Sequence, residues 1–183
     1  TGEVKRDDVV CDLTIKFPGM KLKRVTIKTK DGKGTVTYKD WPQNQWVVPL
    51  LQNTYDIVLQ HGAKYKTLDD VDCTGTSKTV DKIVSNVTIH FEGMKLKRVT
   101  IQTTAGKTVC YKDWPQNKWQ VTLLKNTYKV QLQHGAKYKT VDLDATGDTG
   151  EVKRDDVVCD LTIKFPGMKL KRVTIKTKDG KGT

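Results

Sequence analysis

Residues 11–27 read CDLTIKFPGMKLKRVTI, and a variant of the same stretch, SNVTIHFEGMKLKRVTI, returns at residues 85–101. Within the first copy, LTIKF at 13–17 and VTIKT at 25–29 alternate apolar and polar side chains. A period of two is the pattern of a β-strand with one buried face. The dipeptide PG at 18–19 separates the two runs and favours a turn. The stretch therefore predicts strands joined by a turn, present in at least two copies.

The chain contains two internal repeats, one exact and one imperfect. Residues 1–35 recur letter for letter at 149–183. Within this longer period, YKDWPQNQW at 38–46 matches YKDWPQNKW at 111–119, and QNTYDIVLQHGAKYKT at 52–67 matches KNTYKVQLQHGAKYKT at 125–140. The order is unit A, unit B and the opening of another unit A. We interpret the 183 residues as a window cut from a longer array; a cloning artefact or a circular permutation is the alternative.

The spacing of strands and turns predicts an all-β fold of tandem, immunoglobulin-like antiparallel β-sandwich units. No stretch has the apolar spacing of an amphipathic helix, so we expect almost no helical structure. The strands expected in unit A are 11–17, 23–30, 35–39, 46–50, 54–60, 64–68 and 70–73. The expected domains are unit A at 10–75, unit B at 84–147 and the opening strands of the next unit A at 158–183, with linkers at 1–9, 76–83 and 148–157. Equivalent core positions are Phe17 and Phe91, Ile27 and Ile101, and Leu59 and Leu132.

Composition and motifs narrow the function classes. Lys and Arg number 33 against 21 Asp and Glu, and a net charge of +12 favours acidic partners. No apolar run approaches the roughly 20 residues of a membrane helix, so we expect no membrane span. No G-x-S-x-G, P-loop or H-E-x-x-H motif occurs, and the histidines lack partners at metal-site spacing. We therefore expect no enzyme, no cofactor and no metal.

The most distinctive local motif is the segment at 38–46 with its copy at 111–119. Its aromatic rings can stack on sugars, while its Asp, Asn and Gln side chains can hydrogen-bond to hydroxyl groups. The candidate glycan-binding residues are Tyr38, Trp41, Trp46, Tyr111, Trp114 and Trp119. The alternative, which we favour from the sequence, is that the tryptophans seal one end of the sandwich while Asp40 and Asn44 hold a turn.

Basic residues of unit A gather around its second expected strand. Lys28 and Lys30 fall on one face of that strand, so a basic stripe is expected. Such a stripe would meet phosphates or acidic sugars without sequence specificity. The candidate polyanion-binding residues are Lys21, Lys23, Arg24, Lys28 and Lys30. The alternative, again favoured, is a solvated face whose lysines discourage pairing between sheet edges. Acidic runs at 68–72 and 142–144 are expected to pair with lysines rather than to hold Ca²⁺.

Disulfide candidates are Cys11, Cys73, Cys110 and Cys159. Unit B has Ser85 and Ala145 in place of Cys11 and Cys73, so the two cysteines are lost together, which favours a Cys11–Cys73 bond. Seven alternating strands would instead put these residues at opposite ends of the sandwich, beyond the Cα separation of roughly 7 Å that a bond allows. That geometry makes Cys73–Cys110 the rival. At least one disulfide per period is expected, and with it an oxidising, extracellular compartment.

A unit running LTIKFPGM…RVTIKTKDGKG…LLQNTYDIVLQHGAKYKT resembles the tandem immunoglobulin-like and prealbumin-like (Cna B-type) modules of microbial surface proteins. In those modules a first strand ending in a Gly turn precedes a V-x-V strand and a short Gly loop. A Leu-x-x-x-Tyr-x-Val strand follows later. The resemblance implies tandem β-sandwiches in a stalk-like array at the cell surface.

From the sequence we expect a structural and interaction protein that self-associates into an extracellular stalk, fibre or filament. The alternative hypothesis is a surface-binding module. It would use the Trp loops for glycans, or the basic strand face for acidic polysaccharide or extracellular DNA. Asn86 begins an N-V-T sequon, an N-glycosylation site in a glycosylating host.

Overall fold

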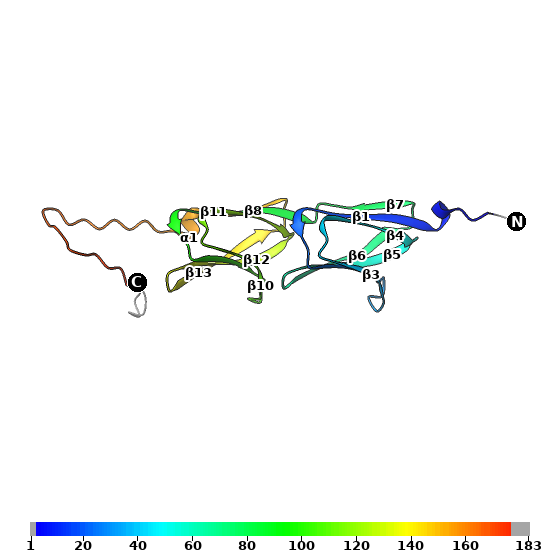
Figure 1. Ribbon diagram of the computed structural model, residues 1–183, viewed down its shortest axis with the longest axis horizontal. Coiled ribbons are helices and arrows are strands. Elements are labelled where there is room, and N and C mark those ends of the chain that lie inside the picture. The colour runs from blue at the N-terminus through cyan, green and yellow to red at the C-terminus, as the bar shows by residue number, and fades with distance from the viewer. Residues whose placement is uncertain (1–2, 177–183) are drawn as a thin grey trace. The chain divides into compact units, whose positions relative to one another are not determined.

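The computed structural model describes residues 3–176 and consists mainly of β-strands. Helix within this range is limited to a 3₁₀ turn (Arg6–Asp8) and the single turn α1 (Arg154–Val157). The chain divides into two compact units, one of residues up to 87 with 122–126 and 145–150, the other of 88–121 with 127–144 and from 151 onward. Sequence units A and B each supply six strands of a sandwich, and the segment that follows each unit supplies the seventh. Figure 1 shows the strands of both sandwiches. The prediction of an all-β chain of tandem sandwiches is confirmed.

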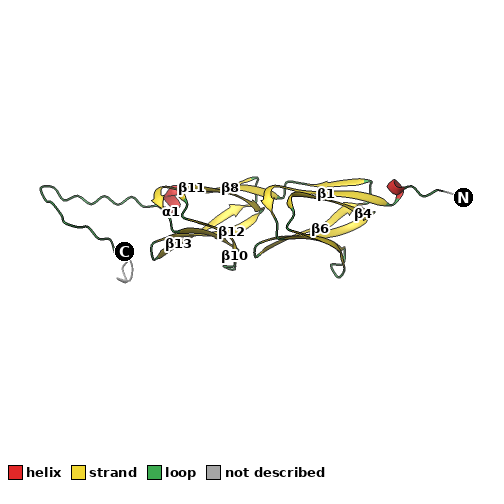
Figure 2. Ribbon diagram, in the orientation of Figure 1, coloured by secondary structure: helices red, strands yellow, loops and turns green. Residues whose placement is uncertain are grey.

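The first sandwich places a three-stranded sheet of order β4-β1-β7 against a four-stranded sheet of order β3-β2-β5-β6 (Figure 2). Its strands are β1 (Val10–Lys21), β2 (Arg24–Thr29), β3 (Thr35–Asp40), β4 (Gln43–Leu51), β5 (Asn53–His61), β6 (Lys64–Cys73) and β7 (Ser77–Val80). Neighbouring strands pair antiparallel except β7, which runs parallel to β1. The expectation of a wholly antiparallel sandwich is wrong at this pair, because the chain enters β7 from the opposite sheet.

Period-two alternation fills the core of the first sandwich. The inward positions of β1, β2 and β5 are all shielded from solvent, and they are Leu13, Ile15, Phe17, Val25, Ile27, Ile57 and Leu59. The register places Val25 opposite Leu59 and Ile27 opposite Ile57, so these apolar side chains share the inner face. Burial of this set is the main stabilising term of the sandwich.

The second sandwich repeats this order, with sheets β11-β8-β14 and β10-β9-β12-β13. Its strands are β8 (Val84–Lys95), β9 (Arg98–Gln102), β10 (Thr108–Asp113), β11 (Gln116–Leu124), β12 (Asn126–His134), β13 (Lys137–Ala145) and β14 (Thr149–Val152). Phe91, Ile101 and Leu132 are buried, as are Phe17, Ile27 and Leu59 in the first sandwich. The predicted core equivalences are confirmed.

The acidic run at 68–72 does not end a strand. The sequence predicted separate strands at 64–68 and 70–73, but both belong to β6. Asp70 adopts a left-handed φ of 55° and its N–H donates to Asp56 Oδ1 at 3.0 Å, where the register with β5 shifts. This β-bulge absorbs one extra residue and lets the strand continue. Cys73 therefore ends the sixth strand rather than a seventh.

Two segments predicted as linkers contain strands. β7 lies within 76–83 and β14 within 148–157, and each completes the three-stranded sheet of its sandwich. Both are only four residues long and largely polar, so they lack the apolar alternation by which the other strands were predicted. The segment joining two repeats thus serves as the last strand of the preceding sandwich.

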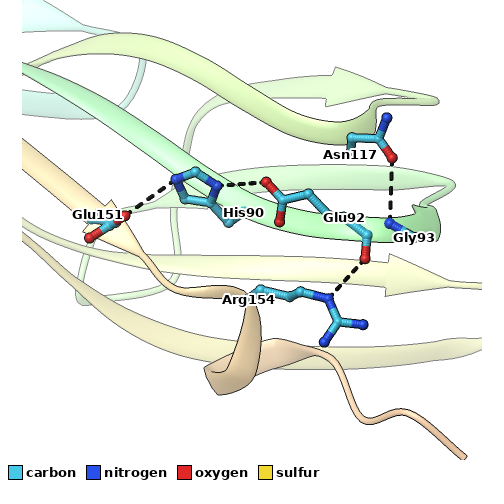
Figure 3. Close-up of polar contacts among 6 residues, drawn as sticks. All are labelled: His90, Glu92, Gly93, Asn117, Glu151 and Arg154. Carbon is cyan, nitrogen blue, oxygen red and sulfur yellow. Dashed lines mark hydrogen bonds and ion pairs between the residues drawn. The ribbon is translucent and has the colours of Figure 1, made fainter.

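Polar contacts connect β14 and its following turn to β8 (Figure 3). His90 Nδ1 lies 2.7 Å from Glu92 Oε1, and His90 Nε2 lies 3.3 Å from Glu151 Oε1. Arg154 Nε donates to the Glu92 carbonyl oxygen at 3.0 Å. The hydrogen bond with His90 holds the pKa of Glu92 below its usual value.

The third copy of unit A does not fold as a sandwich within the described residues. Residues 158–176 form no strand, and apolar side chains such as Ile163 and Phe165 are exposed there. The strands predicted at 158–183 are therefore not observed over this part, and 177–183 lie outside the described residues. The 183 residues hold no third copy of YKDWPQNQW, whose first copy ends β3 and begins β4, the partner of β1. Helices long and apolar enough to cross a membrane are absent from residues 3–176.

Candidate functional site

The outer face of each four-stranded sheet carries aromatic and planar polar side chains. In the first sandwich, strand register brings Arg24 opposite Asp40 on one side and Gln60 on the other, and Gln60 lies opposite Tyr65. We call this surface the aromatic face. In the first sandwich it consists of Arg24, Tyr38, Asp40, Trp41, Gln60 and Tyr65; in the second it consists of Arg98, Tyr111, Asp113, Trp114, Gln133 and Tyr138.

An arginine, an aspartate and a tyrosine form the centre of each aromatic face. Arg98 donates to both carboxylate oxygens of Asp113, at 2.5 and 3.1 Å, and its guanidinium lies 4.5 Å from the Tyr111 ring centroid. In the first sandwich Arg24 contacts Asp40 at 2.6 and 3.0 Å. The hydrogen bond from Arg98 lowers the pKa of Asp113. The carboxylate stays charged and the arginine is held in one orientation.

The tryptophan after each aspartate has an unusual backbone conformation. Trp41 has a φ of 54° and Trp114 a φ of 51°. Left-handed backbone is strained for a bulky side chain and is normally the place of Gly, Asn or Asp. Both indoles are nevertheless exposed, with 59% and 70% of their surface accessible. The same strained conformation with an exposed indole thus occurs at the same turn of both sandwiches.

The second aromatic face is hollowed. One groove of about 280 Å³ is lined by residues that include Arg98, Tyr111 and Tyr138. A second groove of about 380 Å³ shares Arg98 and Tyr138 with it and adds Asp113 and Trp114. Because they share residues, the two grooves form one surface. It combines exposed rings with fixed hydrogen-bonding groups.

The structure separates the six predicted aromatic residues into two groups. Tyr38, Trp41 and their copies Tyr111 and Trp114 are exposed, whereas Trp46 and Trp119 are half-buried on the other sheet. Trp46 packs against the core, whereas Trp41 is exposed, so the structural interpretation of both tryptophans as sealing residues fits Trp46 alone. Trp46 and Trp119 follow the left-handed turn and the change of sheet, so they lie apart from the four exposed rings, and the glycan-binding role of all six residues stays a prediction.

Asp40 and Asn44 also differ from each other. Asn44 Oδ1 accepts from the Gly19 N–H at 3.1 Å, so this asparagine connects β4 to β1. Asp40 instead orients Arg24 on the aromatic face. Sequence reasoning missed Tyr65, Tyr138, Gln60 and Gln133, although YKDW and QHGAKY recur in both units.

The predicted basic stripe is partly neutralised. Arg24 is paired with Asp40, and Lys30 Nζ lies 3.0 Å from Asp70 Oδ1. Lys21 Nζ lies 5.7 Å from the Trp41 ring centroid. Lys23 is exposed and Lys28 is partly exposed. The surface offers a polyanion less free charge than the sequence indicated.

Cys11 and Cys73 meet inside the first sandwich. Both thiols are free and buried, at 0% and 1% exposure. Burial and a hydrogen bond with Cys11 raise the pKa of Cys73 to about 12. The bulged β6 explains this proximity, because a sixth strand ends at the same end of the sandwich at which β1 begins. In the second sandwich Ser85 and Ala145 are fully buried in the corresponding places.

The two remaining cysteines have different surroundings. Cys110 lies on β10 in the second sandwich, near Tyr128, and burial raises its pKa to about 12. Cys159 is exposed in the segment after α1. Asn86 of the sequon is exposed on β8, where its Oδ1 accepts from Thr122 Oγ1 at 3.1 Å. Groups of three or more His, Cys, Asp or Glu able to hold a metal ion do not occur between residues 3 and 176.

Comparison with protein-family models gives no match, and neither does comparison with curated proteins. Among solved structures, the Bacillus anthracis TIE protein matches 79% of this chain and 34% of its own length at 15% identity and a TM-score of 0.34. The human OSCAR ligand-binding domain matches over 71% of this chain and 93% of its own at 9% identity and 0.26. A Bacteroides thetaiotaomicron leucine-rich repeat protein covers 79% and 26% at 14% identity and 0.22. This chain thus spans about a third of the TIE protein chain, and all three likenesses are distant.

Proposed function

We propose that this chain is part of an extracellular structural and interaction protein in which tandem β-sandwiches build length and their aromatic faces bind glycans. The observation that carries the proposal is the exposed tryptophan in left-handed conformation, repeated in both sandwiches beside an Arg–Asp–Tyr cluster. The role is binding rather than catalysis.

The chemistry of the aromatic face suits sugars. A pyranose ring presents an apolar C–H face, which packs on an aromatic ring, and an edge of hydroxyl groups, which need donors and acceptors in fixed positions. Exposed Trp114 and Tyr138 supply rings, and Arg98 and Asp113 supply a donor and an acceptor that hold each other in place. Preorganised groups lose little conformational entropy when a ligand binds.

Replacing both exposed tryptophans by asparagine separates binding from stability. Asn tolerates a left-handed φ, so in the W41N/W114N variant we expect an increase in the free energy of unfolding of about 1 kcal/mol per site. We also expect glycan binding to fall by about tenfold or more, because the stacking rings are gone. Urea unfolding and a glycan array on the full chain measure the two effects.

Val47→Ala is the matched control for this variant, because Val47 is an exposed apolar residue of β4 on the other sheet. It should leave glycan binding unchanged. Unaltered glycan binding by W41N/W114N would contradict the proposed function. Binding of heparin or DNA alone, abolished by moderate salt, would instead favour a polyanion.

The array part of the proposal rests on the repeat and on the strands that join the repeats. β7 and β14 belong both to a sandwich and to the connection that follows it, so the connections are short and structured. Near-identical modules joined this way build length. Electron microscopy of the native material should show a regular stalk, fibre or filament, and dispersed monomers would contradict self-association.

The Cys11–Cys73 pair supports an extracellular location. We propose that the two thiols form a disulfide in an oxidising compartment. Each sulfur loses a proton, the S–S bond forms, and the two electrons pass to a small disulfide such as oxidised glutathione, which becomes two thiols. Because the pKa of Cys73 is about 12, thiolate is scarce in the folded chain and oxidation precedes or accompanies folding.

A further inference from the structure

The six residues of the aromatic face are of the same types in both sandwiches, but neighbouring positions on the same sheets differ. The groove of about 280 Å³ on the second sandwich is lined by Gln102 and Gln131 together with the side chains it shares with the aromatic face. Thr100 pairs with Gln131 and Gln102 with Lys129. In the first sandwich, at the same register, Thr26 pairs with Val58 and Lys28 with Asp56. Gln102 of the second sandwich thus corresponds to Lys28 of the first, and Gln131 corresponds to Val58.

We propose that the groove on the second sandwich is a binding site for an uncharged oligosaccharide, and that the first sandwich lacks this site because Lys28 and Val58 replace Gln102 and Gln131. This inference rests on the proposed glycan-binding function and deepens it. It assigns the ligand class and the sandwich that binds it.

An uncharged ligand is favoured because the groove of about 280 Å³ has a single charged lining residue, and a neighbouring residue of opposite charge neutralises it. Arg98 lines it and is paired through two hydrogen bonds with Asp113. A polyanion would have to displace that carboxylate or lie against it. Lys97 lines only the adjoining groove, and Lys129 lies opposite Gln102. Binding of a polyanion at this edge is therefore a separate outcome of the test.

Glutamine amides provide what a neutral sugar requires. Each amide has one acceptor oxygen and two donor hydrogens, which match the donor and acceptor character of vicinal hydroxyls. Gln133 Nε2 donates to the Gly135 carbonyl oxygen at 3.2 Å, which fixes its orientation and leaves its oxygen toward other donors. Within residues 3–176 the side chains of Gln102 and Gln131 have no hydrogen-bond partner of their own. Both are partly exposed and free to bind.

Exchanging the two positions between the sandwiches tests the inference on the full chain. The first variant, Q102K/Q131V, gives the second sandwich the residues of the first. The reciprocal variant, K28Q/V58Q, gives the first sandwich the residues of the second. The probes are cellohexaose, mannohexaose, chitohexaose and heparin, titrated by calorimetry and by side-chain amide NMR.

We expect at least one neutral hexasaccharide to bind with one site per chain. In Q102K/Q131V its affinity should fall by about tenfold or more, since both amide acceptors are lost and residue 131 can no longer form a side-chain hydrogen bond. In K28Q/V58Q the number of sites should rise from one to two. All four positions lie on outer strand faces, so unfolding midpoints should stay close to that of the parent chain.

The other possible outcomes contradict either this inference, the uncharged ligand class or the proposed glycan-binding function. A neutral probe that binds both variants as it binds the parent chain would overturn this inference and leave the glycan-binding function standing. Heparin binding alone, tighter in Q102K/Q131V because of the added lysine, would overturn the uncharged ligand class and favour a polyanion. Failure of every probe to bind the parent chain would overturn both the inference and the proposed glycan-binding function.

Discussion

Reducing the proposed Cys11–Cys73 disulfide is expected to lower the free energy of unfolding of the first sandwich by about 4 kcal/mol. The bond would close a loop of roughly sixty residues, and removing it restores the conformational entropy of that loop in the unfolded chain. Both sulfurs are buried between the two sheets, so the folded geometry already holds them together. Urea unfolding of oxidised and reduced full chain gives the difference directly.

The second sandwich supplies the matched control. C11S/C73A copies the Ser85 and Ala145 found there, and its unfolding should be indifferent to reductant. Thiol titration should find two free thiols fewer in the oxidatively refolded chain than in the reduced chain. Equal stability of the oxidised and reduced forms, or four free thiols after oxidative refolding, would contradict the bond and remove its support for an oxidising compartment.

Truncating the buried phenylalanine of the second sandwich is expected to have a similar effect. Phe91 is fully shielded from solvent on β8, the central strand of its sheet. Phe91→Ala removes a ring and leaves a cavity between the sheets, which costs about 3–5 kcal/mol. Urea unfolding gives the loss, and hydrogen exchange should show that β9 and β12 lose protection more than β2 and β5.

Leu51→Ala is the control for Phe91→Ala, because Leu51 is 70% exposed at the end of β4. Its effect should stay within about 0.5 kcal/mol. Phe17→Ala should reproduce the loss in the first sandwich, since Phe17 is equally buried. A loss below about 1 kcal/mol for both phenylalanines would contradict the core assignment.

The two sandwiches share the residues of the aromatic face but differ at neighbouring positions on the same sheets. The Arg–Asp pair, the two tyrosines and the left-handed tryptophan occur in both sandwiches. Lys28, Asp56 and Val58 of the first correspond to Gln102, Lys129 and Gln131 of the second. A tandem chain can thereby hold sites of different ligand preference on one scaffold, and multiple weak sites raise overall avidity when they bind the same polymer.

Much of the fold follows from the sequence alone. Alternation marks Phe17, Ile27 and Leu59 as inward residues, and the repeat identifies their equivalents, because burying one face of a strand requires a period of two. The loss of Cys11 and Cys73 together in unit B indicates their proximity, since two residues replaced as a pair commonly share a contact. These inferences need only local pattern and comparison of the two copies.

The tertiary structure determines which residues distant in sequence lie next to each other. Local pattern could not show that Asp70 forms a bulge, and that bulge determines which end of the sandwich Cys73 reaches. Nor could it show that Tyr138 lines the same groove as Arg98 and Trp114. These residues come from strands distant in sequence, and their proximity depends on the strand order and register of the folded sheet. Short polar β7 and β14 pair because the sheet edge offers unpaired backbone groups, and each adds a single valine, Val80 or Val152, that is at least partly buried. The face of a strand is a local property, whereas its neighbours depend on packing of the whole sandwich.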